Sequence, residues 1–338
     1  MKNYRNLKLF YVVLLLILTS VNIFAQGDKP ADKPKVSADE AKAAKKIQDA
    51  KTFTEKLTAS SDFIKKFPQS SLRKQVVEYV SGQVFDSKDD NQSITNSQSF
   101  MAVFTNPAET DAIVPSVIDA MLRLKRLDEA FATADKYLGR HDDDDVVVRL
   151  QLSIEGSNQL RTNNGKYATQ TKDYSSKAIQ LIEANTKPAN LTDENWKEYQ
   201  TKWLPELYTS LGFAYMFLND ADTAQVCFKK TVTLDEKNIT GWYMLCTSVN
   251  ENYQDLAKKY TVASGTEKET LLKKANETLD KVIDIFARVT ALTDGNANYQ
   301  PLNAQVRQDL EAYYKYRHSN STKGMQELID SFKVAKTN

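Results

Sequence analysis

Apolar residues recur at intervals of three and four from Ser37 to the end of the chain. This spacing places them on one side of a helix, whereas a half-buried strand requires strict alternation. The apolar run at residues 146–150 could form a strand in isolation, but it has no partner strand nearby and is expected to be helical. The 338 residues include 10 glycines and 8 prolines, which is few for a turn-rich sheet protein. We therefore predict an all-α fold.

Turn-forming residues divide this pattern into helices with short connectors. Ser37 is a favourable N-cap, because Asp39 and Glu40 then occupy the first turn, where acidic groups suit the helix dipole. The periodicity leaves open a compact bundle or a stacked array of helix pairs. The predicted helical stretches cover residues 37–67, 72–85, 94–104, 108–124, 127–138, 146–160, 167–184, 195–218, 221–234, 241–263, 267–292, 302–317 and 323–335.

The N-terminus has the pattern of an export signal. Three basic residues precede an apolar run at residues 9–18, polar residues interrupt it, and Ala25 is a suitable last residue before cleavage. The rival interpretation is a membrane anchor, but even residues 9–24 number only 16, and a spanning helix needs about 20. We expect residues 1–25 to be a cleaved signal peptide and the mature protein to be periplasmic or secreted. No membrane span is expected after cleavage.

The charge balance argues against a nucleic-acid partner. Lys and Arg total 45 and Asp and Glu total 44, so the formal net charge is +1. Removing the three basic residues of the signal leaves the mature chain at −2. Such a chain has no basic excess to neutralise phosphates. Residues 26–36 mix Gly, Pro, Asp and Lys with little apolar content, and are expected to be a flexible linker.

The sequence contains no motif of a phosphate-binding loop, a dinucleotide site, a zinc protease or a C-x-x-C pair. Two cysteines and two histidines are too few for a thiolate zinc site or a histidine-rich metal site. The polar cluster at residues 141–145 could be read as a metal site. However, consecutive side chains do not point at one centre, and Asp145 is a good N-cap for the helix that follows. We expect no enzymatic activity, no cofactor and no metal.

The clearest internal motif is a Tyr followed by Leu-Gly and by a second Tyr on one helix, and then by Ala and Phe on the next helix. Gly212 and Ala224 are small, so two helix backbones can approach closely there. The motif resembles the tetratricopeptide (TPR) repeat, although Glu236 stands where that family usually has Pro. It implies stacked antiparallel helix pairs that form a TPR-like α-solenoid. The motif spans residues 205–238 and consists of Tyr208, Leu211, Gly212, Tyr215, Ala224 and Phe228.

A second unit at residues 239–292 resembles the same repeat. It begins with Trp242-x2-Leu245-Cys246, which has Cys in place of the packing Gly, and its second helix carries Ala275-x3-Leu279. Alanines at comparable places on predicted second helices recur at intervals of 48, 46 and 51 residues, which exceed the 34 of the usual repeat and suggest longer helices or inserts. They are Ala130, Ala178, Ala224 and Ala275.

The resemblance divides the chain into parts. Residues 37–107 are expected to be divergent N-terminal helices, residues 108–292 TPR-like repeats, and residues 293–338 helices that cap the array. An aromatic and basic stretch at residues 313–318 could be a stacking surface for a ligand. Helical spacing favours a cap on the last repeat instead.

Cys227 and Cys246 lie on adjacent helices of the repeat, with 18 residues between them. In an oxidising exported compartment they could form a disulfide, worth about 3 kcal/mol on the chain-entropy model. The alternative is two buried thiols that pack as small apolar residues. Cys246 replaces the packing glycine of its repeat, which favours burial.

In TPR proteins the first helix of each pair lines a concave surface that holds a peptide or a partner's helix. The resemblance therefore implies a non-enzymatic scaffold or assembly factor that binds a protein or peptide. Phe213 and Phe217 could instead be covered by a neighbouring helix. The candidate surface residues are Glu206, Thr209, Phe213, Met216 and Phe217 from one repeat, and Thr240, Tyr243, Thr247, Asn250 and Glu251 from the next.

The alternative function is an extracytoplasmic solute-binding protein, similar to the TPR-based sugar-binding proteins of bacterial cell surfaces. Trp196, Trp203 and Trp242 could provide an aromatic platform for a carbohydrate. Those proteins are generally larger and lipid-anchored, and no cysteine follows the apolar run here. The partner and the oligomeric state do not follow from the sequence.

Overall fold

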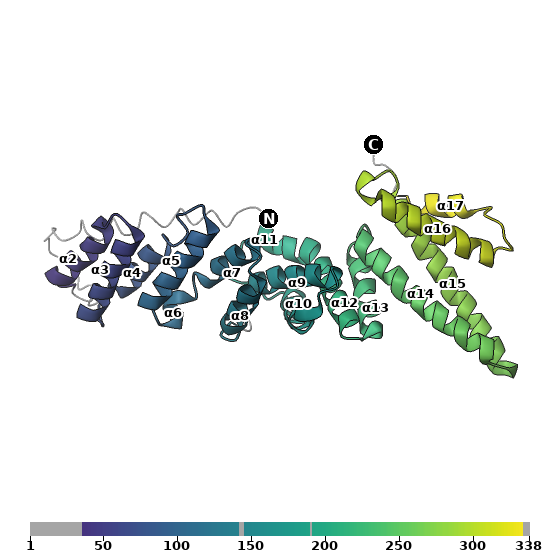
Figure 1. Cartoon of the computed structure of the whole chain (residues 1–338), viewed down its shortest axis with the longest axis horizontal. Coiled ribbons are helices and arrows are strands. Elements are labelled where there is room, and N and C mark those ends of the chain that lie inside the picture. Colours follow the sequence, from purple (N-terminus) through teal and green to yellow (C-terminus); the bar gives the residue numbers. More distant parts are fainter. Residues whose placement is uncertain (1–35, 142–144, 190, 334–338) are drawn as a thin grey trace, which may run out of the picture. The chain divides into compact units, whose positions relative to one another are not determined.

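The structure is a computed structural model that describes residues 36–141, 145–189 and 191–333. Within these ranges every regular element is helical, and neighbouring helices pack in pairs (Figure 1). The predicted all-α fold of stacked helix pairs is confirmed. The described residues form two compact units, one within residues 1–142 (unit 1) and one within residues 143–338 (unit 2). The predicted signal peptide, residues 1–25, lies outside the described residues.

Unit 1 is a succession of packed helices whose core contains Phe63, Phe100 and Phe104. The helix Phe53–Lys66 packs against the helices Ala38–Asp49 and Asp90–Val103, and the helix Val114–Arg123 packs against the helices Asp90–Val103 and Leu127–Leu138. Its helices are α2 (Ala38–Asp49), α3 (Phe53–Lys66), α4 (Arg73–Ser81), α5 (Asp90–Val103), α6 (Pro107–Thr110), α7 (Val114–Arg123) and α8 (Leu127–Leu138).

The single helix predicted over residues 37–67 is wrong, because two helices occupy this range. Thr52 accepts the Glu55 backbone N–H, and the Glu55 side chain accepts the Thr52 N–H. This capping box starts a new helix at Phe53. The buried ammonium of Lys56 donates to the Ala50 carbonyl at 2.6 Å and to the Tyr79 hydroxyl at 3.1 Å, which fixes the end of α2.

The helix predicted over residues 108–124 is also two elements, α6 and α7. Asn106 caps the first of them, and its side chain accepts the Ala108 N–H. The pair of α7 and α8 is confirmed. Lys125, in the left-handed region at φ 57°, makes the tight turn between them.

In the described part of unit 2 three helix pairs follow one another, α9 with α10, α12 with α13, and α14 with α15, and both α16 and α17 pack against α15. Its elements are α9 (Val146–Arg161), η2 (Gly165–Tyr167), α10 (Ala168–Glu183), α11 (Asp193–Glu198), the π-helical turn η3 (Tyr199–Trp203), α12 (Leu204–Phe217), α13 (Ala221–Leu234), α14 (Ile239–Val262), α15 (Gly265–Thr293), η4 (Ala297–Tyr299), α16 (Gln300–Arg317) and α17 (Met325–Ser331).

Close packing explains the glycine of the repeat motif. A Cβ at Gly212 on α12 would lie 2.6 Å from the Phe228 ring on α13, so any side chain there would clash. A Cβ at Gly156 on α9 would lie 2.0 Å from the Thr171 hydroxyl oxygen on α10. The first two pairs of unit 2 therefore share a small-residue contact between their helices.

Two clusters of buried residues form the core of unit 2. One lies between α9, α10, α12 and α13 and contains Leu207, Leu211 and Cys227. The other extends from the end of α9 and the start of α10 through α12 to α17, and it contains Phe228 and Cys246. Cys227 and Phe228 are neighbours in sequence yet belong to different clusters, so α13 is covered on two sides.

The four alanines at near-regular intervals lie on α8, α10, α13 and α15, each the second helix of a pair, and all are buried. Their places within the helices differ, because Ala224 is the fourth residue of α13 whereas Ala178 is the eleventh of α10. The predicted domain limits at 107/108 and 292/293 rest on repeat resemblance and stay predictions.

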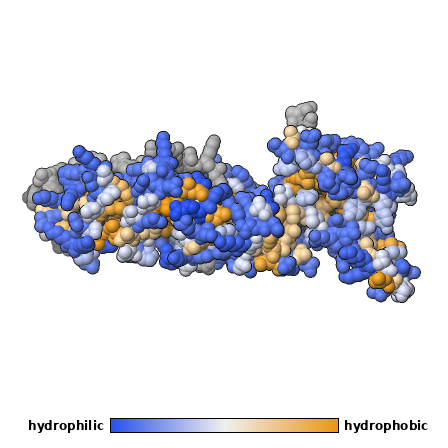
Figure 2. All heavy atoms as spheres, in the orientation of Figure 1, coloured by the Kyte–Doolittle hydropathy of each residue, from blue (hydrophilic) through white to orange (hydrophobic). Residues whose placement is uncertain are grey.

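The hairpin of α14 and α15 is much longer than the other pairs. The two helices have 24 and 29 residues, and their free end extends past the other helices of unit 2 (Figure 1). Hydrophobic residues lie at this end (Figure 2), where Val262 is 86% exposed and Leu272 is 42% exposed. No described helix has the length and apolar character needed to cross a membrane.

Candidate functional site

The predicted surface residues lie on α12 and α14, the first helices of two pairs in unit 2. We call the side chains that α9, α12, α14 and α16 present outside the two core clusters the first-helix face. Exposure divides the ten candidates into three groups. Met216, Tyr243 and Glu251 are exposed; Glu206, Phe217, Thr240, Thr247 and Asn250 are half-buried; Thr209 and Phe213 are buried.

Thr209 and Phe213 are core residues in this structure, and their side chains do not present a binding surface. The Thr209 hydroxyl is fully buried and donates to the Pro205 carbonyl at 3.0 Å, with the Thr231 hydroxyl 3.2 Å away. Phe213 is 8% exposed and meets the Phe228 ring edge-on at 5.7 Å. The expectation that both side chains line the concave surface is therefore corrected.

Other candidates connect neighbouring first helices to each other. The Asn238 side chain, at the start of α14, donates to the Glu206 carboxylate on α12 at 3.2 Å. The Tyr313 hydroxyl on α16 donates to the Asn250 side chain on α14 at 2.8 Å. Glu206 and Asn250 are therefore hydrogen-bonded to other residues of unit 2, and these bonds connect neighbouring helices of the fold.

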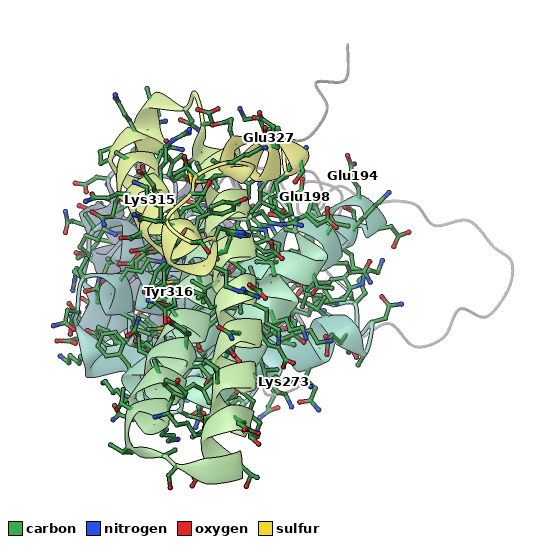
Figure 3. All side chains as sticks on the ribbon, turned by 90° about the vertical axis from the view of Figure 1, so that its right-hand side faces the viewer. Glu194, Glu198, Lys273, Lys315, Tyr316 and Glu327 are labelled. Carbon is green, nitrogen blue, oxygen red and sulfur yellow. The ribbon has the colours of Figure 1, made fainter. Side chains whose placement is uncertain are left out.

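Tyr313 belongs to the stretch predicted to cap the array. Its ring stacks on Phe286 of α15 at 5.8 Å and meets Tyr253 of α14 edge-on at 5.9 Å. Tyr314 is buried and donates to the Lys323 carbonyl. By contrast Tyr316, labelled in Figure 3, is 73% exposed.

The sequence reasoning missed Arg161, the last residue of α9. Its guanidinium lies over the Phe213 ring, 4.8 Å from the centroid, and the side chain is exposed. Arg161 stands five residues after Gly156, as Phe217 stands five residues after Gly212. Using Gly156 as the equivalent of Gly212 would have placed Arg161 among the candidates.

The electrostatics around Arg161 are unusual for an exposed arginine. Desolvation by the surrounding protein lowers the pKa of its guanidinium, while the nearby Glu206 carboxylate and Tyr299 hydroxyl act in the opposite direction. Among the described residues no carboxylate forms an ion pair with Arg161. Arginine stays cationic at any physiological pH, so this is a fixed, partly desolvated positive charge.

The three tryptophans do not form one aromatic platform. Trp196 is buried and donates to the Asn185 side chain at 2.8 Å. Trp203 is half-buried beside the same cluster. Trp242 packs against the other cluster and lies under the Arg288 guanidinium, 4.5 Å from the ring centroid.

Cys227 and Cys246 are buried free thiols in separate core clusters, so the structure contains no disulfide between them. Burial raises the pKa of the Cys227 thiol to about 12, and it also raises the pKa of Cys246. The interpretation as small apolar core residues fits this structure.

The polar cluster at residues 141–145 is only partly described, since residues 142–144 lie outside the described ranges. The His141 ring pairs with the Asp111 carboxylate at 3.0 Å, and Asp145 caps α9 by accepting the Val148 N–H. In the ranges that the structure covers, no three His, Cys, Asp or Glu side chains gather as metal ligands would.

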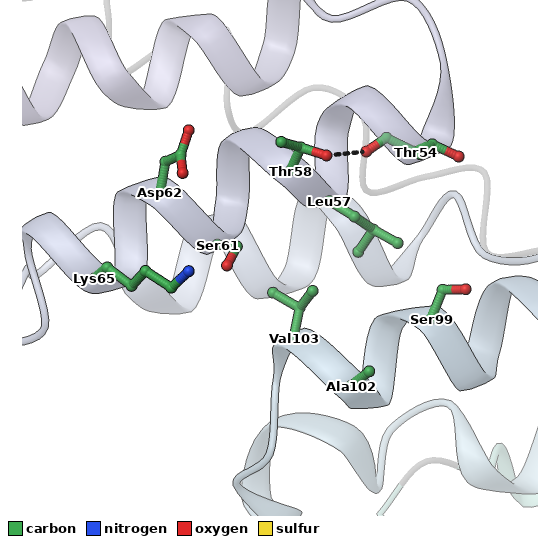
Figure 4. Close-up of a pocket in the computed structure, with 9 residues that line it drawn as sticks. All are labelled: Thr54, Leu57, Thr58, Ser61, Asp62, Lys65, Ser99, Ala102 and Val103. Carbon is green, nitrogen blue, oxygen red and sulfur yellow. Dashed lines mark hydrogen bonds between the residues drawn. The ribbon is translucent and has the colours of Figure 1, made fainter.

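Unit 1 has a shallow hollow between α3 and α5 (Figure 4). Leu57 and Val103 form its apolar floor, and hydroxyl groups and the charges of Asp62 and Lys65 surround it. Its volume is about 430 Å³, and the Thr58 hydroxyl donates to the backbone carbonyl of Thr54 beside it. Nothing in this hollow resembles a catalytic arrangement of an acid, a base and a nucleophile.

No protein-family model matches the chain, and no curated protein matches it significantly. Among solved structures the chain is similar to the C-terminal part of a TPR repeat-containing protein from Cytophaga hutchinsonii, at 14% sequence identity and a TM-score of 0.33. The alignment covers 87% of this chain and 98% of that one. A likeness at this level says nothing about function.

Proposed function

We propose that this chain is an exported, non-enzymatic protein of the TPR type that binds a protein or peptide on the first-helix face of unit 2. The helix pairs with their small-residue contacts support the TPR assignment, and the N-terminal pattern supports export. The binding role is that of a scaffold or assembly factor.

The distribution of exposed apolar side chains supports the proposed position of the binding surface. Large exposed apolar side chains gather in unit 2, whereas Val36 is the single such residue in the described part of unit 1. Aromatic and Met side chains are enriched at protein interfaces, where they anchor the partner. The exposed aromatic and Met side chains on α12, α14 and α16 are Met216, Tyr243 and Tyr316, while the exposed Val262 lies at the free end of α14.

The test compares two matched double variants as baits in the exported fraction of the source organism. Met216→Gln/Tyr243→Ser removes two apolar anchors from the first-helix face. Val226→Gln/Leu234→Ser removes two exposed apolar side chains from α13, a second helix. Losing two anchors should weaken partner retention at least about tenfold, while the α13 variant should retain the partner.

The native protein purified from that fraction should begin at Gln26. Equal retention by both variants would contradict the first-helix face as the binding surface. Loss of retention in the α13 variant alone would move the surface to the second helices. Because all four positions are exposed, helical circular dichroism should be unchanged in both variants.

A further inference from the structure

Among the arginines that the structure describes, Arg149 is buried, and Arg161 differs from the remaining ones in its contacts. In unit 1 each described arginine is paired with a carboxylate, and in unit 2 Arg317 pairs with Asp280 at 2.7 Å while Arg307 donates to the Gln326 side chain. The paired arginines of unit 1 are Arg73, Arg123, Arg126 and Arg140.

The Arg288 guanidinium also contacts aromatic rings, but it lies between Trp242 and Phe332, 4.5 Å from each ring centroid. Two rings of this chain therefore contact the Arg288 guanidinium. Among the described residues, Phe213 supplies the one aromatic ring that lies over the Arg161 guanidinium, and Arg161 as a residue is exposed. Its planar fork of N–H donors is oriented by that ring and has no acceptor from the described residues.

This arrangement suits a carboxylate better than other anions. A guanidinium binds a carboxylate with two parallel charge-assisted hydrogen bonds, and partial desolvation strengthens them. The Glu206 carboxylate lies near enough to act on the Arg161 charge, so it repels a doubly charged phosphate about twice as strongly as a singly charged carboxylate at the same place. The near-neutral chain also offers no broader positive field for a nucleic acid.

We propose that Arg161 binds the side-chain carboxylate of an aspartate or glutamate in the protein segment that occupies the first-helix face, so that the partner is acidic at this point. This inference rests on the proposed function, because it assigns the chemistry of the same surface. The Phe213 ring holds the guanidinium in place, and the Asn238 amide engages Glu206.

The probe is a labelled, capped peptide of alternating glutamate and tyrosine, with a matched peptide in which glutamine replaces glutamate. Binding to the whole protein is measured by fluorescence anisotropy. The wild type should prefer the glutamate peptide by about tenfold. Arg161→Gln should abolish that preference, and Arg161→Lys should retain part of it, since the charge remains but the fork is lost.

Lys229→Gln, at an exposed position on α13, is the matched loss of one positive charge and should leave the preference intact. The preference should also disappear below about pH 4, where the peptide carboxylates are protonated. Unchanged thermal unfolding of each variant shows that the fold is retained.

A preference for glutamate that survives Arg161→Gln would overturn the inference, and so would equal binding of both peptides by the wild type. Failure of either peptide to bind the wild type at about 1 mM would overturn it as well. If the wild type binds both peptides equally, weaker binding of both peptides to the Tyr243→Ser variant would still support the first-helix face as the binding surface. The two proposals can therefore fail separately.

Discussion

A hydroxyl on a helix can be buried because it bonds the carbonyl four residues earlier. The fully buried Thr171 and Thr290 hydroxyls do this at 2.7 and 2.8 Å. The Thr209 hydroxyl also donates to the carbonyl four residues earlier, so the polarity of Thr209 does not distinguish a surface position from a core position. Sequence register identified the correct helix for each candidate, but exposure depended on which neighbouring helix covered it.

The two cysteines give a prediction at the scale of single residues. Because burial raises the pKa of Cys227 to about 12, its thiolate fraction at pH 8 should be about a thousandfold lower in the folded chain than in the unfolded one. Ellman's reagent should therefore modify neither thiol until denaturant is added, and intact mass should show both thiols reduced.

The same shift fixes the direction of the pH dependence of stability. The folded state keeps its thiol protons while the unfolded state loses them near pH 9. The free energy of unfolding should therefore fall as pH rises above about 9, and replacing both cysteines with alanine should weaken that slope. Rapid modification of the native chain would show that the thiols are accessible.

At the scale of elements, helix existence followed from periodicity, and helix limits followed from local signals. The limits of α8 agree with the predicted stretch at residues 127–138. The range 37–67 was misjudged because Thr52 and Glu55 form a capping box inside a continuous apolar pattern. Periodicity continues across such a break because both helices bury the same side.

The Lys56→Met variant tests whether the buried Lys56 ammonium stabilises the break between α2 and α3. The methionine can fill the buried space but cannot donate to the Ala50 carbonyl, so the end of α2 should fray. We expect unit 1 to lose about 1–3 kcal/mol of unfolding free energy, measured by urea denaturation with circular dichroism. Lys65→Met, at an exposed site on the same helix, should change it by less than about 0.5 kcal/mol.

All three tryptophans lie in unit 2, so tryptophan fluorescence reports that unit alone. Lys56→Met should shift the circular dichroism transition and leave the fluorescence midpoint in place. A stability equal to the wild type would show that the buried ammonium contributes no net stabilisation.

At the scale of the whole molecule, the sequence did not reveal the division at residues 142/143. The repeat motif is specific only near residues 205–245, so the sequence could not show where one packed core ends and the next begins. The equivalence of Gly156 and Gly212 was not recognised either, so Arg161 was not among the candidate residues although both helices of its pair were predicted.

Residues 143–338 expressed alone should fold, because both core clusters of unit 2 lie within them. The urea midpoint by tryptophan fluorescence should match that of the full chain. A shorter chain that starts at residue 168 lacks α9, exposes the apolar side of α10 and α12, and should lose its cooperative transition. A midpoint that drops in the longer fragment would show that unit 1 stabilises unit 2.

The long hairpin has a kinetic consequence. Near Val262 and Leu272 the two helices extend past the other described helices of unit 2, whereas nearer the core they are held by the larger buried cluster. Opening of the free end therefore breaks few contacts and leaves the rest of the unit in place. Its amide protons should exchange with solvent long before those around Leu279, and a protease should nick it there first without releasing either fragment.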